Sequence, residues 1–320
     1  MRRSPPSFTG PGPGLGLVLV LLAFAASLTG CSRPEPGPLK GRGEGRKTIM
    51  VTYTILGSLV RDLAGDSFDV KSLVPNGMDI HEWEPSARDV EALMHADLIV
   101  ANGLGLEGGM EKTLSRAREA GRPIFLASDQ VRVRRVGQGE GIPTNDPDQA
   151  VGAEDPHLWT DPLAMKAVVD ALALDLGSRF GVDLSSRAAA LDERLLALDA
   201  EIRDSVAALP QERRSIVTGH ESMGWFAERY GFRLVGALVP SLSTQAGASA
   251  SWLASLKGLI AKNGVKVIFT EVGTPRQVVD ALARETGARA VPLATHVLPP
   301  DGSYFTFERE LAATVVAGLE

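Results

Sequence analysis

Four histidines stand in turns, where imidazoles could bind a metal ion. The chain has five histidines in 320 residues, and four of them lie in loop-like stretches beside glycine, proline or aspartate. Neutral imidazole suits borderline-soft metals, and several imidazoles without a thiolate indicate zinc, with other first-row metals as alternatives. Calcium and magnesium would require oxygen ligands instead. The candidate ligands are His81, His157, His220 and His296.

A structural role is the alternative explanation for each of these side chains. A single loop histidine is more often a surface residue or a hydrogen-bonded core residue, and the spacings here are too long to form a motif. His95 lies in a helical run without a turn and is left out. Glu82, Glu154 and Glu221 stand near histidines and could act as bases of a zinc hydrolase, although support of a ligand or simple solvation is the commoner role. The HExxH, GxSxG, P-loop and GxGxxG motifs do not occur.

The elements around these histidines alternate between strands and helices, which is typical of parallel sheets covered by helices. His220 and His296 each follow a β-prone run, so we expect both at the carboxyl ends of strands. A capping box at Ser86 and Asp89 marks one helix start, and Thr274 is expected as an N-cap before a proline. The expected strands are 49–53, 68–74, 98–101, 123–126, 215–218, 233–237, 267–270 and 290–293.

One long amphipathic helix separates two such alternating halves. Leucine, isoleucine and valine recur every three or four residues from Leu191 to Leu209, after a helix that opens at Asp161-Pro162. We therefore expect an α/β fold of two lobes, each a parallel sheet flanked by helices, joined by a rigid helix. The limits are 47–184, 185–209 for the helix, and 210–320. Ligands of open α/β sheets lie beyond the carboxyl ends of strands, which predicts a site in the cleft between the lobes.

The N-terminal residues are expected to be an export signal and a tether. Arg2 and Arg3 precede a short apolar run, and residues 28–31 (LTGC) resemble a bacterial lipobox, in which Cys31 is lipidated after removal of residues 1–30. A conventional signal peptide or an uncleaved anchor is the alternative. Residues 31–46, rich in proline, glycine and charge, are expected to form a flexible tether. A single cysteine excludes internal disulfides and every zinc site that needs two thiolates.

Composition and charge exclude other classes of protein. The chain is 44% hydrophobic and 22% charged, as in ordinary globular proteins. Its 33 basic and 39 acidic residues give a formal charge of −6, which does not favour nucleic acid as a partner.

Several stretches resemble the zinc and manganese solute-binding proteins of bacterial ABC importers, and the resemblance extends over residues 48–320. Such proteins have two α/β lobes joined by a rigid helix, with the metal between them. The matching stretches are 79–86 (DIHEWEPS), 96–107 (ADLIVANGLGLE), 155–162 (DPHLWTDP), 218–220 (TGH), 224–227 (GWFA) and 269–271 (FTE).

The resemblance implies that His81, His157 and His220 are metal ligands, and a histidine at the third position favours zinc. The fourth ligand is commonly a carboxylate, whereas this chain has His296 there and Asp301 as the nearest carboxylate. Many zinc-type proteins also carry a His-rich loop before the second ligand. No histidine occurs in 136–154, so an auxiliary zinc-collecting loop is not expected here.

The implied function is capture of Zn²⁺ outside the cytoplasm and its delivery to an ABC permease, without catalysis. We expect a monomer held by a lipid anchor at Cys31 on the outer side of the cytoplasmic membrane, in the periplasm or at the cell surface. A Mn²⁺-type binding protein, a chelate-binding or adhesin lipoprotein and, third, a zinc hydrolase are the alternatives.

Overall fold

The computed structural model describes residues 45–138, 140, 151–245 and 247–320. The expected export signal, Cys31 and nearly all of the tether lie outside the described residues. Arg46–Glu320 form one compact unit. Among the residues described, the structure has no helix that is both long enough and apolar enough to span a membrane.

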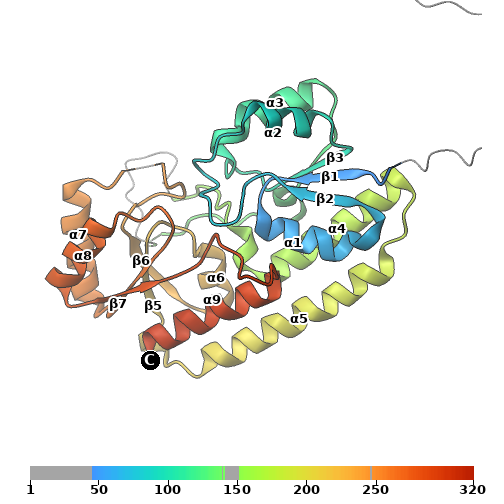
Figure 1. The fold of residues 1–320 in the computed structure, drawn as a ribbon. Coiled ribbons are helices and arrows are strands. Elements are labelled where there is room, and N and C mark those ends of the chain that lie inside the picture. The colour runs from blue at the N-terminus through green and yellow to red at the C-terminus, as the bar shows by residue number, and fades with distance from the viewer. Residues whose placement is uncertain (1–44, 139, 141–150, 246) are drawn as a thin grey trace, which may run out of the picture. The chain divides into compact units, whose positions relative to one another are not determined.

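The first sheet has four parallel strands in the order β2-β1-β3-β4. Helices α2 and α3 lie over one face, and α1 and α4 over the other (Figure 1). All four expected strands are confirmed, and the capping box forms at α2. The elements are β1 (Thr48–Val51), α1 (Thr54–Ala64), β2 (Asp69–Ser72), α2 (Ala87–Met94), β3 (Leu98–Ala101), α3 (Glu111–Glu119), β4 (Ile124–Leu126) and α4 (Pro162–Phe180).

The second sheet repeats this topology in the order β6-β5-β7-β8, again with all strands parallel. Helices α7 and α8 pack together beside it (Figure 1). The C-terminal helix α9 begins beside α1 and runs back to the second sheet, where the chain ends (Figure 1). The elements are β5 (Ser215–Thr218), α6 (Gly224–Tyr230), β6 (Arg233–Ala237), α7 (Ala250–Asn263), β7 (Val267–Thr270), α8 (Arg276–Thr286), β8 (Arg289–Pro292) and α9 (Tyr304–Leu319).

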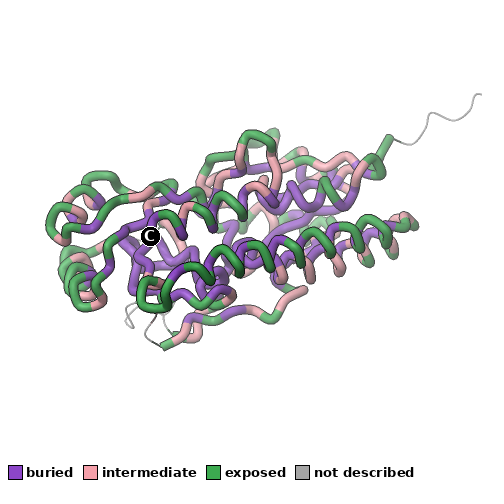
Figure 2. Tube along the Cα trace, turned by 90° about the horizontal axis from the view of Figure 1, so that it is seen from below, coloured by how far each residue is buried: buried purple, intermediate pink, exposed green. Residues whose placement is uncertain are grey.

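The expected long helix is α5 (Ser185–Ala207), which joins the two sheets. Its inner residues, among them Leu191, Leu195, Leu198 and Ile202, are buried against α4 and α9. Figure 2 shows buried and exposed residues alternating turn by turn along the long helices. One continuous apolar core includes side chains from both sheets, so the fold holds the two sheets in a fixed relation through packed side chains.

Strand order reverses between β1 and β3 in one sheet and between β5 and β7 in the other. At such a reversal point the chain connections from two neighbouring strands run to opposite sides of the sheet. This leaves a crevice at the carboxyl ends of the two strands. Residues that follow β5 and β7 therefore stand side by side at this edge. The sequence supplies His220 after β5 and Glu271 after β7.

One local prediction was wrong, and several helices, α9 among them, were not predicted individually. Helix α8 begins after Pro275, which is its N-cap, so Thr274 is not the cap. The Thr274 hydroxyl instead accepts a hydrogen bond from the Glu271 backbone N–H at 2.9 Å. Helix α9, which no sequence pattern was used to predict, begins at Tyr304 with Ser303 as its N-cap.

Candidate metal centre

The four candidate histidines converge on one point. One nitrogen of each imidazole lies within 4.8 Å of the corresponding nitrogen of the other three. The His157 Nε2 is 3.3 Å from the His81 Nε2 and 3.3 Å from the His220 Nε2. All four residues are buried, with 8% exposure at most, for His296. Residues up to 215 positions apart in sequence thus form a single cluster of ring nitrogens.

Each histidine is delivered by a loop at the carboxyl edge of a sheet. His220 follows β5 and His296 follows β8, as predicted, while His81 lies in the loop after β2. His157 immediately precedes a short 3-10 helix, η5 (Leu158–Thr160), which leads into α4. His95 stands apart at the exposed end of α2, where its Nδ1 faces the Glu91 carbonyl at 2.8 Å.

Carboxylates fix the orientation of two of the rings. The His157 Nδ1 lies 2.9 Å from an Asp155 oxygen, and the His220 Nδ1 lies 2.9 Å from a Glu271 oxygen. An ionised carboxylate only accepts hydrogen bonds, so each Nδ1 carries the proton and each neutral Nε2 keeps a lone pair. The two lone pairs therefore point at one another across 3.3 Å, an arrangement that a cation between them stabilises.

A hydroxyl fixes the third ring. The His296 Nδ1 lies 2.8 Å from the Thr295 hydroxyl, which donates to Glu271 at 2.8 Å. Because the hydroxyl proton is directed to the carboxylate, the hydroxyl accepts from Nδ1–H, which leaves the His296 Nε2 as an acceptor. That Nε2 has no hydrogen-bond partner among the described residues. Glu271 thus orients His220 directly and His296 through Thr295.

Two of the nitrogen separations fit a tetrahedral zinc ion. A tetrahedron with Zn–N bonds of about 2.0–2.1 Å has edges of about 3.3–3.4 Å. Both of the short nitrogen separations, each 3.3 Å, match that edge. The carboxylate–imidazole pairs are also the usual partners of zinc-bound histidines, where they fix the tautomer and raise the basicity of the ligand.

Protonation divides the four histidines into three and one. Burial, and then the repulsion of neighbouring imidazoles, lowers the pKa of His81, His157 and His296 well below the ordinary value. Burial would also lower the pKa of His220, but the charge and hydrogen bond of Glu271 outweigh it, and this pKa is raised. Three rings are therefore neutral and ready to bind a cation at neutral pH. His220 is the ring that takes up a second proton, on Nε2, most readily.

The carboxylates respond to the same contacts. Burial would raise the pKa of Glu271, but the attraction of His220 and several hydrogen bonds lower it to about 2. For Asp155 burial prevails and raises the pKa to about 6, although Arg134 opposes the rise. Both groups are mainly ionised at neutral pH, so the cluster is faced by two negative charges.

The other candidate residues lie outside the nitrogen cluster. Asp301, the alternative fourth ligand, is exposed and accepts hydrogen bonds from the Ser303 N–H and the Thr306 hydroxyl near the start of α9. Glu82 and Glu154 are exposed. Glu221 is 2% exposed, and neither of its oxygens has a hydrogen-bond partner in the described part of the chain.

A cavity leads towards the cluster from one side. It has a volume of about 530 Å³ and is lined in part by His81, Gly105, Pro156 and Gln245. The Gln245 side chain donates a hydrogen bond to the His81 carbonyl at 2.5 Å, which links the loops of the two sheets across the cluster. This cavity is a space through which an ion could approach His81.

Sequence reasoning missed the contacts that orient the rings. The roles of Asp155, Glu271 and Thr295 were not predicted, although the first two lie in stretches that carried the family resemblance. Arg134, whose guanidinium contacts Asp155, was not singled out at all. An acidic residue two positions before His157 was the one local signal, because such a spacing lets a carboxylate reach back to the ring.

Comparisons with known proteins indicate a family of metal-binding proteins. The family described as "Zinc-uptake complex component A periplasmic" matches residues 49–318. The zinc-binding protein TroA of Treponema pallidum is 32% identical over 269 residues, covering 82% of this chain and 80% of that protein. The manganese-binding lipoprotein MntA of Halalkalibacterium halodurans is 26% identical over 298 residues, covering 91% of this chain and 93% of that protein.

Solved structures show the same fold. The periplasmic zinc-binding protein TroA from Treponema pallidum superposes with a TM-score of 0.75 and 28% identity, over 86% of this chain and 99% of that one. A manganese-bound periplasmic metal-binding protein from Candidatus Liberibacter asiaticus has a TM-score of 0.74 at 22% identity. Two parallel four-stranded sheets with flanking helices are thus common to this chain and these proteins.

Proposed function

Since the chain belongs to the family of periplasmic zinc-uptake components, which are metal-binding substrate-binding proteins of ABC transporters and not enzymes, we propose that its cargo is Zn²⁺. The proposed ligands are His81, His157, His220 and His296. The ion is captured outside the cytoplasm, held without chemical change, and handed to a membrane permease.

One observation carries the choice of zinc over manganese. The cluster consists of four imidazole nitrogens with no carboxylate oxygen among them. Carboxylate and water oxygens suit Mn²⁺, whereas four nitrogens in a tetrahedral arrangement suit Zn²⁺. Relatives that bind manganese by name, such as MntA, make Mn²⁺ the second candidate, and the two ions are separated by the test below.

The remaining parts of the proposal concern location and organisation. We propose residues 1–30 as the signal, lipidation at Cys31, a tether over 31–46, lobes over 47–184 and 210–320, and a linking helix over 185–209. Relatives named as lipoproteins support the anchor. The protein is proposed to act as a monomer at the outer side of the cytoplasmic membrane.

A chelator-competition titration tests the cargo. Metal-stripped protein comprising residues 46–320 is titrated with Zn²⁺ and separately with Mn²⁺, and stoichiometry and affinity are measured. We expect one Zn²⁺ bound far more tightly than Mn²⁺. Because the Irving–Williams order alone favours zinc, the same titration is made on His157→Ala and on the control His95→Ala.

The outcomes separate the candidate functions. Loss of zinc binding in His157→Ala with normal binding in His95→Ala supports the proposal. Mn²⁺ binding as tight as Zn²⁺ binding would make the manganese-type protein the better description. Absence of tight binding of either ion would favour a chelate-binding or adhesin lipoprotein. Turnover of ester or phosphate substrates that depends on His157 would revive the hydrolase.

A further inference from the structure

Two short segments behind the metal centre pair in antiparallel fashion. The Asp155 N–H donates to the Arg134 carbonyl at 3.0 Å, and the Val136 N–H donates to the Ala153 carbonyl at 2.9 Å. Arg135 and Glu154 form a bridge between these two contacts. Successive side chains on extended segments point to opposite sides, so Arg134 and Asp155 share one side while Arg135 and Glu154 share the other.

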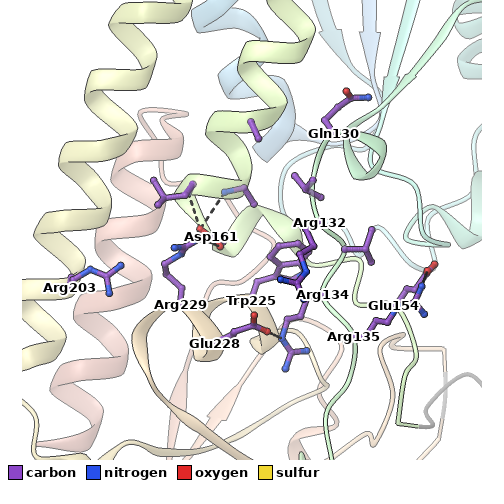
Figure 3. Close-up of a pocket in the computed structure, with 15 residues that line it drawn as sticks. Gln130, Arg132, Arg134, Arg135, Glu154, Asp161, Arg203, Trp225, Glu228 and Arg229 are labelled. Atoms are coloured by element: carbon purple, nitrogen blue, oxygen red, sulfur yellow. Dashed lines mark hydrogen bonds and ion pairs between the residues drawn. The ribbon is translucent and has the colours of Figure 1, made fainter.

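The two sides carry the same type of ion pair in different surroundings. Arg134 and Asp155 form a pair at 3.0 Å, with side chains 4% and 0% exposed. Arg135 and Glu154 also form an ion pair, but their side chains are 59% and 42% exposed. Figure 3 shows Arg135 beside Glu154 and Arg134 beside Glu228, on separate parts of one pocket wall. An exposed pair contributes little, whereas a buried one fixes its partners in place.

The buried pair leads directly to a proposed ligand. One Asp155 oxygen faces the Arg134 Nη1, and the other accepts from the His157 N–H at 3.0 Å and faces the His157 Nδ1 at 2.9 Å. The carboxylate is therefore held on one side by the guanidinium and holds the imidazole on the other. Rotation of the carboxylate would break both sets of contacts together.

Arg134 is itself held by two further carboxylates. Its Nη2 lies 2.6 Å from Glu140, and its Nε lies 3.2 Å from Glu228 on α6. The planar guanidinium fork donates hydrogen bonds to Asp155 and Glu140 at fixed angles, which an ammonium group cannot do, while its Nε faces Glu228 as an ion pair without a hydrogen bond. The first residue of α6 is Gly224, where an added Cβ would collide with both Asp155 and Arg134. Helix α6 thus closes over the ion pair.

From this geometry we propose that Arg134 is a positioning residue of the metal centre, which acts through Asp155 to aim the His157 Nε2 at the ion. The proposal rests on the proposed function, in which His157 binds zinc. A merely structural ion pair would stabilise the fold without altering affinity for the ion. Substitution of a positioning residue therefore lowers zinc affinity, whereas substitution of a merely structural residue lowers only the stability of the fold.

Adjacent arginines provide a matched comparison. Arg134→Gln and Arg135→Gln each remove one guanidinium and one positive charge from neighbouring positions. Arg134→Gln removes contacts with three carboxylates, whereas Arg135→Gln removes the contact with Glu154 alone. Loss of a group that orients a zinc ligand costs about 10–100-fold in metal affinity. We expect zinc affinity to fall by about that factor in Arg134→Gln and to stay within about twofold of wild type in Arg135→Gln. Equal affinities in the two variants would overturn the proposal.

A double-mutant cycle tests whether Arg134 acts through Asp155. Residues that act as one unit show non-additive effects. We expect Asp155→Asn to weaken zinc binding, and the double variant Arg134→Gln with Asp155→Asn to bind no more weakly than Asp155→Asn alone. Additive losses would mean that Arg134 does not act through Asp155.

A spectroscopic measurement and a conservative variant complete the test. Tetrahedral Co²⁺ gives intense visible absorption, so Co²⁺-loaded Arg134→Gln should show a weaker or shifted spectrum, while Arg135→Gln matches wild type. Arg134→Lys keeps the charge without the fork, and we expect an intermediate zinc affinity. If Arg134→Gln does not fold, the zinc affinity of Arg134→Lys tests the proposal in its place. Wild-type affinity and spectrum in Arg134→Lys would overturn the proposal, whereas failure of wild-type protein to bind zinc would overturn the proposed function itself.

Discussion

The substitution Glu271→Gln should weaken zinc binding by about 10–100-fold, or about 1.4–2.8 kcal/mol. Glu271 accepts hydrogen bonds from the His220 N–H at 2.9 Å, from its Nδ1 at 2.9 Å, and from the hydroxyls of Ser222 and Thr295. It is 7% exposed, so water cannot readily replace these contacts.

The loss follows from where a glutamine amide would place its NH₂ group. Turned towards His220, the NH₂ faces two N–H donors and leaves them unpaired, at a cost of about 1–3 kcal/mol. Turned towards Thr295, it makes that hydroxyl an acceptor, and the hydroxyl proton then points at the His296 Nδ1. The Nε2 of His296 would carry the proton and cease to be a ligand. Either orientation impairs one proposed ligand.

The pH dependence of the affinity provides a second readout of the same variant. Glu271 raises the pKa of His220, so lowering the pH through that pKa adds a competing proton, and affinity falls by about tenfold per pH unit. Without the carboxylate the pKa of His220 falls, and proton competition begins at lower pH. The ratio of wild-type to variant affinity should therefore be largest at high pH and shrink on acidification.

Chelator-competition titrations at several pH values measure both effects. Glu285→Gln is the control, because Glu285 is an exposed glutamate that pairs with Lys257 away from the histidines. The reasoning is refuted if Glu271→Gln binds zinc as tightly as Glu285→Gln, or if the two share one pH profile.

Four further substitutions have defined outcomes. His157→Ala should lower zinc affinity by orders of magnitude, beyond the roughly 100-fold upper range for groups that only orient ligands, in the same titration. His296→Ala should cause a smaller loss because water can complete the tetrahedron, and Asp301→Ala should cause none; a loss in Asp301→Ala would restore that carboxylate as a ligand. Burial raises the pKa of Glu308 well above its ordinary value in the folded protein. As the pH rises, the unfolded chain therefore loses this proton before the folded protein does, and the free energy of unfolding falls once the pH exceeds the pKa of Glu308 in the unfolded chain. Glu308→Met should therefore raise the free energy of unfolding at pH 7 by about 1–3 kcal/mol, with a smaller gain at pH 4, and denaturant titrations showing no gain at pH 7 would contradict this.

The elements were predictable because their patterns are local. All eight strands were predicted within a few residues. The inner strands β1, β3, β5 and β7 are short apolar runs that are almost wholly buried, as expected in parallel sheets covered on both faces, whereas the edge strands β2 and β8 are partly or mostly exposed. The linking helix was predicted over 185–209 and is observed over Ser185–Ala207. The start of α8 was misjudged by one residue because the Thr274 hydroxyl contacts a loop backbone rather than its own helix.

The histidine cluster was predictable in part, and its supporting contacts were not. Turn residues and strand ends marked the four histidines, and the topology brought them together. The partners of the rings depend on pairs that are distant in sequence, such as Glu271 with His220 at 51 positions and Arg134 with Asp155 at 21. No periodicity in the chain encodes such pairs, so only the folded arrangement of the loops reveals them.

X-ray absorption spectroscopy of the zinc-loaded protein tests the central claim most directly, because it counts the atoms bound to the ion and identifies their type. Four histidines predict four nitrogen ligands at about 2.0–2.1 Å with multiple scattering from imidazole rings. A spectrum with an oxygen ligand in place of one imidazole would contradict a four-histidine site, and five or six ligands would contradict the tetrahedral site from which zinc was inferred.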